Sequence, residues 1–89
     1  MGRLDQEYIR RCLKAAEKGE AKAFYDLGLH YSTGNGVPLD YVEAHKWFNL
    51  AAVCGLKRAK IDRAEIARDM STAEIAEAQR QAREWMQHR

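Results

Sequence analysis

The sequence has little that would interrupt or oppose helices. Pro38 is its single proline, and valine, isoleucine and threonine together total nine residues against 14 alanines. Because β-branched residues favour strands and alanine favours helices, this balance predicts an all-α fold. Long apolar runs are also lacking, so we expect no membrane span.

Cysteine is scarce as well. Cys12 and Cys54 are too few for a disulfide framework, and they do not form a CxxC pair. The first residues are charged and lack an apolar stretch, so we expect no signal peptide. Together these features predict a cytoplasmic protein.

Charge of one sign is not in large excess. The 15 basic and 13 acidic residues give a net charge of +2, which is too weak to favour nucleic acid as a partner, and we expect none. The weakest alternative that we considered is nucleic-acid binding through three basic residues of the first helix. These are Arg10, Arg11 and Lys14, and Glu7 and Glu17 lie close to them in sequence.

Residues suited to catalysis do not cluster in the sequence. His30, His45 and His88 share no spacing with a cysteine or carboxylate that is typical of a metal site. Ser32 and Ser71 lie in turn or cap contexts, without the sequence of a nucleophile elbow. We therefore expect no enzyme activity, no metal and no cofactor.

What the sequence does contain is helical periodicity. Apolar residues recur at helical spacing over about 5–18, 20–33, 41–54, 57–69 and 72–87, which predicts five helices. Asp40 with Glu43, and Ser71 with Glu74, have the spacing of capping boxes. The residues expected to face inward include Ile9, Cys12, Leu13, Ala16, Phe24, Leu27, Gly28, Ala44, Trp47, Phe48, Ala51, Ala78, Ala82, Trp85 and Met86.

The chain also contains an internal repeat. The segment 15–19, with Ala23 after it, matches the segment 51–55, with Ala59 after it, at an offset of 36 residues. A period of this length is typical of helix-turn-helix solenoids, in which neighbouring helix pairs bury faces that a single pair leaves exposed.

Residues 20–55 resemble a Sel-one-like repeat, a relative of the tetratricopeptide repeat. The positions that match are Ala23, Leu27, Gly28, Tyr31, Gly34, Gly36, Val37, Asp40, Ala44, Trp47, Ala51, Ala52, Gly55 and Ala59. The resemblance implies one domain over 1–89, with a half unit at 5–19, a full repeat at 20–55 and a degenerate C-terminal cap at 56–89. It also implies an α/α superhelix, or solenoid, of antiparallel helix pairs.

The resemblance further implies a non-catalytic adaptor that binds a partner peptide on its concave face, a role often found in bacterial signalling or envelope scaffolds. If the first helix of each pair lines that face, the expected partner-binding residues are Lys22, Tyr25, Leu29, Ser32, Arg58, Ile61, Glu65 and Arg68. The alternative is a self-associating structural unit, a homodimer through the N-terminal helix with Tyr8, Ile9 and Leu13 at the contact.

Overall fold

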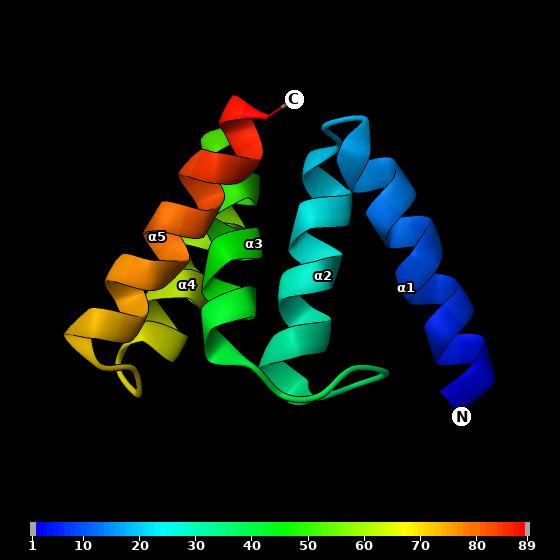
Figure 1. The fold of residues 1–89 in the computed structure, drawn as a ribbon, viewed down its shortest axis with the longest axis horizontal. Coiled ribbons are helices and arrows are strands. Elements are labelled where there is room, and N and C mark those ends of the chain that lie inside the picture. Colours follow the sequence, from blue (N-terminus) through cyan, green and yellow to red (C-terminus); the bar gives the residue numbers. More distant parts are fainter. Residues whose placement is uncertain (1, 89) are drawn as a thin grey trace.

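A computed structural model describes residues 2–88 of the chain, and Figure 1 shows its fold. These residues form five helices and no strand, which confirms the predicted all-α class. The helices are α1 (Gly2–Glu17), α2 (Ala21–Thr33), α3 (Tyr41–Val53), α4 (Lys57–Ala67) and α5 (Thr72–Gln87). In Figure 1 the chain runs up α1, down α2 and up α3, and α1 and α5 lie on opposite sides of the molecule.

Local signals end and begin the helices much as predicted. Gly34 ends α2 in the left-handed conformation, with φ of 71°, and its N–H bonds to the carbonyl of His30. The Ser71–Glu74 capping box at α5 is complete: the Ser71 Oγ accepts from the Glu74 N–H at 3.1 Å, and the Glu74 carboxylate accepts from the Ser71 N–H at 2.8 Å.

The capping box predicted at α3 is half formed. The Asp40 carboxylate accepts from the Glu43 N–H at 3.2 Å, as predicted. The Asp40 N–H donates instead to the Tyr31 carbonyl at 2.9 Å, and the Glu43 carboxylate accepts from the Trp47 Nε1–H at 3.0 Å and pairs with Lys46 at 3.0 Å. Glu43 therefore fixes side chains inside α3 instead of capping the helix.

Helix α3 lies at the centre of the packing. It contacts α2, α4 and α5, whereas α1 packs against α2. Its predicted inner residues Ala44, Trp47, Phe48 and Ala51 are all buried. Phe24 of α2 stacks on Trp47 at a centroid distance of 6.0 Å, and Trp85 of α5 meets Trp47 edge-on at 4.9 Å. This aromatic cluster joins α2, α3 and α5.

Three expectations about the core are corrected. Leu13 and Met86 were expected to face inward but are exposed, and Leu50, which was not selected, is buried. Leu13 lies on a helix that packs against α2, so its side of α1 has no neighbouring helix to cover it.

Among residues 2–88, no helix is both long enough and apolar enough to cross a bilayer.

Candidate functional site

The predicted partner-binding residues lie on α2 and α4. Lys22, Tyr25, Leu29 and Ser32 are on α2; Arg58, Ile61 and Glu65 are on α4, and Arg68 follows the last turn of α4. We call the surface formed by these eight residues the α2–α4 face.

A direct contact joins the two helices of this face. The Tyr25 hydroxyl donates a hydrogen bond to the Asp62 carboxylate, and the Arg58 Nε lies 3.6 Å from the same Asp62 oxygen. The Tyr25 ring also packs against Phe48 at a centroid distance of 5.6 Å. Tyr25 and Arg58, which belong to the same predicted set, thus meet at Asp62, which was not among the predicted residues.

A second cluster of the same kind joins α1 to α2. The Asp26 carboxylate oxygen accepts from the Tyr8 hydroxyl at 3.0 Å and from the Lys22 ammonium at 3.1 Å. We refer to Tyr8, Asp26 and Lys22 as the first Tyr–Asp–cation cluster. Tyr25, Asp62 and Arg58 form the second.

The tyrosines stay protonated in both clusters. The hydrogen bond to Asp26, with smaller effects of burial and of the Asp26 charge, raises the pKa of Tyr8 to about 12. Burial and, next, the hydrogen bond to Asp62 raise the pKa of Tyr25. Each hydroxyl therefore remains a donor to its carboxylate throughout the physiological pH range.

The two clusters differ sharply in what they expose to solvent. The Lys22 side chain is 84% exposed and its partner Asp26 17% exposed, while the Arg58 side chain is 69% exposed and Asp62 12%. The cations therefore point outward, and the carboxylates that balance them are covered.

A signal for the missed aspartates is present in the sequence. Asp26 and Asp62 are 36 residues apart, the offset of the internal repeat, and each has a cation four residues earlier, Lys22 or Arg58. That spacing places the two charges on one helix face. The tyrosines do not follow the offset, so their role becomes visible in the fold alone.

The remaining residues of the face differ in what they offer. Leu29 and Ile61 are exposed apolar side chains, and Glu65 and Arg68 are exposed charges. The Ser32 hydroxyl donates to the Leu29 carbonyl at 3.1 Å, so its proton is used within α2. Ser32 therefore has no free hydroxyl proton to donate to a partner.

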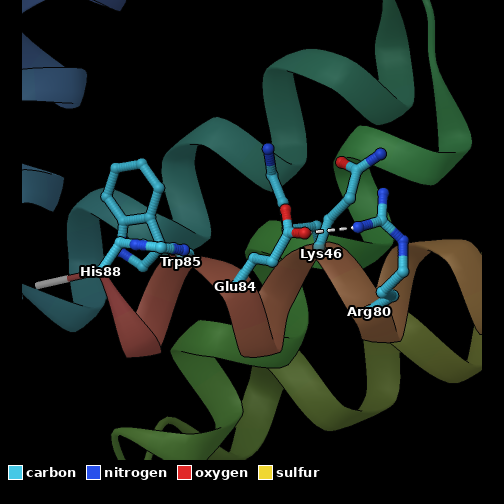
Figure 2. A pocket seen from close by; sticks show the side chains of 6 residues that line it. Lys46, Arg80, Glu84, Trp85 and His88 are labelled. Atoms are coloured by element: carbon cyan, nitrogen blue, oxygen red, sulfur yellow. Dashed lines mark hydrogen bonds and ion pairs between the residues drawn. The ribbon is translucent and has the colours of Figure 1, made fainter.

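A hollow of about 370 Å³ lies elsewhere, between α3 and α5. Figure 2 shows Glu84, Trp85 and His88 along α5, with Lys46 of α3 across from them. The Lys46 ammonium already pairs with Glu43 and lies 4.5 Å from the centroid of the Trp47 ring. Its charge is therefore balanced without a ligand.

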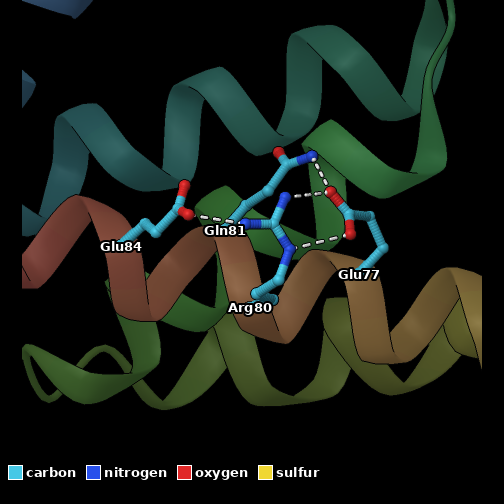
Figure 3. A network of polar contacts seen from close by, with 4 residues as sticks. All are labelled: Glu77, Arg80, Gln81 and Glu84. Atoms are coloured by element: carbon cyan, nitrogen blue, oxygen red, sulfur yellow. Dashed lines mark hydrogen bonds and ion pairs between the residues drawn. The ribbon is translucent and has the colours of Figure 1, made fainter.

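The positive charge of Arg80, which also lines this hollow, is balanced by two glutamates, as Figure 3 shows. Arg80 donates to both oxygens of Glu77, at 3.0 and 2.6 Å, and to Glu84 at 2.6 Å. The bonds from Arg80, and next the bond from Gln81, lower the pKa of Glu77 to about 2. This network is a set of helix-surface ion pairs between residues three and four apart, and it leaves little charge to bind a ligand.

A smaller, mostly apolar hollow of about 210 Å³ lies where the C-terminal ends of α3 and α5 approach the turn after α1. Its lining includes Val53, Cys54 and Met86, all of them exposed. The other cysteine, Cys12, is buried, and burial raises the pKa of its thiol. Among residues 2–88, no three side chains of His, Cys, Asp or Glu are grouped as metal ligands would be.

Two of the three residues predicted at a homodimer contact make contacts within the chain instead. Ile9 is buried in the core, and the Tyr8 hydroxyl is bonded to Asp26. Leu13 is exposed and lines a hollow of about 300 Å³ together with Val37. The basic residues Arg10, Arg11 and Lys14 lie on the exposed side of α1 with Glu7.

No protein-family model matches the chain. No curated protein matches it either.

Proposed function

We propose that the chain is a non-catalytic protein-interaction module that binds a peptide segment of a partner on the α2–α4 face. The observation that carries the proposal is the contact between Tyr25 and Asp62, which joins α2 to α4 beside exposed apolar side chains, Leu29 and Ile61. Apolar anchors next to polar groups with fixed geometry are typical of peptide-binding surfaces.

The proposal includes the repeat architecture implied by the sequence. In it, α2 and α3 form the complete Sel-one-like repeat, α1 is a half unit, and α4 opens the next unit of a short solenoid. Two pairs of residues related by the 36-residue offset support this arrangement, since Ala23 and Ala59 are both buried, and so are Cys12 and Phe48. Helix α5 packs against α3, as expected of a cap that covers the last apolar face.

The test is a selection of short random peptides against the whole protein, followed by NMR mapping of the selected peptides. We expect the largest amide shifts at Tyr25, Leu29 and Ile61. Replacing Ile61 by Ser should weaken binding by about tenfold, which corresponds to the loss of an apolar anchor that contributes about 1.4 kcal/mol.

Val53→Ser provides the matched control. Val53 is 60% exposed and Ile61 58%, so the two substitutions remove similar exposed apolar groups from different surfaces. We expect Val53→Ser to leave peptide affinity within about twofold. Val53 lines the apolar hollow near the end of α5, so the opposite pattern would place the binding surface there and contradict the proposal.

A further inference from the structure

We infer that the segment bound by the α2–α4 face is acidic, with its carboxylates contacting Lys22 and Arg58. This inference rests on the proposed function and goes beyond it by naming the chemistry of the partner. It is carried by the two Tyr–Asp–cation clusters, in which the same three groups meet at one carboxylate oxygen.

The first step concerns what a partner meets at each cluster. In formal charge each Asp–cation pair is neutral, but the carboxylates are largely covered and the cations are largely exposed. A group that approaches from solvent therefore meets the ammonium of Lys22 and the guanidinium of Arg58 before it meets Asp26 or Asp62.

The second step concerns the hydrogen-bonding capacity that remains. A lysine ammonium has three N–H donors, and the arginine guanidinium has five. Asp26 takes one donor of Lys22, and Asp62 faces the Nε of Arg58. Two donors of Lys22, and the N–H groups of Arg58 that Asp62 and Tyr25 do not engage, remain to bond a partner carboxylate, and such charge-assisted bonds are stronger than neutral ones.

The third step concerns the tyrosines, which act as positioning residues. Each hydroxyl donates to an aspartate oxygen, so it holds the carboxylate beneath its cation and reduces the negative charge that a partner meets. Tyr8 lies on α1 and Tyr25 on α2, so each tyrosine comes from a different helix than the Asp–cation pair that it contacts. The fold, not the individual helix, sets the orientation of each cation.

The fourth step concerns the wider charge of the face. Among the eight residues of the face, Lys22, Arg58 and Arg68 are basic and Glu65 is acidic. Glu65 is the acidic residue on the exposed part of the face, and it lies two helical turns from Arg58. The face as a whole favours a negative partner, and Leu29 and Ile61 add apolar contacts beside the cations.

The experiment compares two double variants of the whole protein that change net charge equally. Lys22→Gln with Arg58→Gln removes the exposed cations of the two clusters. Lys14→Gln with Arg83→Gln removes two exposed cations from α1 and α5. Short random peptides are selected against the unmodified protein, and the best peptide is also made with Gln in place of each Glu and Asn in place of each Asp.

We expect the selected peptides to be enriched in Asp and Glu. The Lys22→Gln and Arg58→Gln variant should bind the best peptide about tenfold more weakly or worse, and the Lys14→Gln and Arg83→Gln variant should stay within about twofold. The uncharged peptide should bind the unmodified protein more weakly than the charged peptide does. The Lys22→Gln and Arg58→Gln variant should bind the two peptides with similar affinity. Circular dichroism of both variants reports that the helices are intact.

Three results would overturn the inference. Neutral or basic peptides that shift the amides of the α2–α4 face would leave the proposed function standing and remove the acidic partner. Tighter binding of a single-stranded oligonucleotide than of any selected peptide, lost in the Lys22→Gln and Arg58→Gln variant, would assign the cations to phosphates. Peptides that shift α5 instead would contradict both the inference and the proposed function.

Discussion

At the scale of single residues, His45 stands out because it is a polar side chain within the helical core. It is buried on α3, and its Nδ1 atom has no hydrogen-bond partner among the described residues. Burial lowers the pKa of His45, and the positive charge of Arg63 on α4 lowers it further. The imidazole is therefore neutral in the folded protein at neutral pH.

This burial predicts a loss of stability in mild acid. An unfolded histidine takes up a proton near pH 6.5, and the folded one resists protonation until lower pH. Below about pH 6.5 the unfolded chain binds more protons than the native one, so the free energy of unfolding falls as the pH falls. Its slope from this residue is at most about 1.4 kcal/mol per pH unit.

The measurement is the urea midpoint at pH 7 and pH 5. We expect a lower midpoint at pH 5 for the unmodified protein. His45→Leu, which replaces the imidazole by an apolar group of similar size, should show a smaller difference between the two pH values. An equal difference in both proteins would mean that other groups cause the acid sensitivity.

At the scale of helices, α2 and α3 depend on a glycine for their close approach. A Cβ atom added at Gly28 would lie 2.4 Å from two ring carbons of Phe48, far closer than carbon atoms pack. The Phe48 ring is almost fully buried, so it has little room to move.

Gly28→Ala should therefore destabilise the protein, although alanine favours a helix by about 1 kcal/mol over glycine. Overpacking of a tight core typically costs about 1–3 kcal/mol, so we expect a net loss of stability in thermal or urea unfolding. In the Phe48→Leu background Gly28→Ala should cost less stability than in the unmodified protein, because the smaller Leu side chain makes room for the added methyl group. Equal costs of Gly28→Ala in both backgrounds would rule out the clash as the cause.

The helices themselves were predictable because their limits are set by nearby residues. Gly34 and Ser71 act through their own backbone or through residues within one turn, and the sequence reveals both. Glu43 shows where such reasoning fails. Its carboxylate has three possible partners within one turn, and the bonds to Trp47 and Lys46 form instead of the cap.

At the scale of the whole molecule, helical periodicity identifies an apolar face but not the helix that covers it. For this reason the buried stripe of α3 was predicted well, and the exposure of Leu13 and Met86 was not. The candidate face was predicted in the same incomplete way. The resemblance to a Sel-one-like repeat selected Tyr25 and Arg58, but their meeting at Asp62 depends on how α2 and α4 pack around α3.

The attachment of α5 yields a test of how the whole molecule unfolds. Its Trp85 ring meets Trp47 at 4.9 Å and Phe24 at 6.4 Å, both edge-on, and α5 has its main helix contact with α3. Trp85→Ala removes these contacts, and we expect it to cost somewhat less than the roughly 3–5 kcal/mol typical of fully buried tryptophans, because Trp85 is half-buried. The other buried residues of α5 are the small Ala78 and Ala82, so without the Trp85 ring we expect α5 to unfold before the rest of the chain.

Two spectroscopic probes separate the outcomes in this variant. Trp47 is then the single tryptophan, so fluorescence follows α3, while far-ultraviolet circular dichroism follows all the helices. We expect the dichroism transition to begin at lower urea than the fluorescence transition, because α5 melts away from a core that α2, α3 and α4 still form. Trp85→Phe keeps an aromatic ring on α5 and also leaves Trp47 as the single tryptophan, so it should keep the two transitions coincident. Coincident transitions in Trp85→Ala would mean that α5 unfolds together with the core and that the aromatic contacts are not what ties it there.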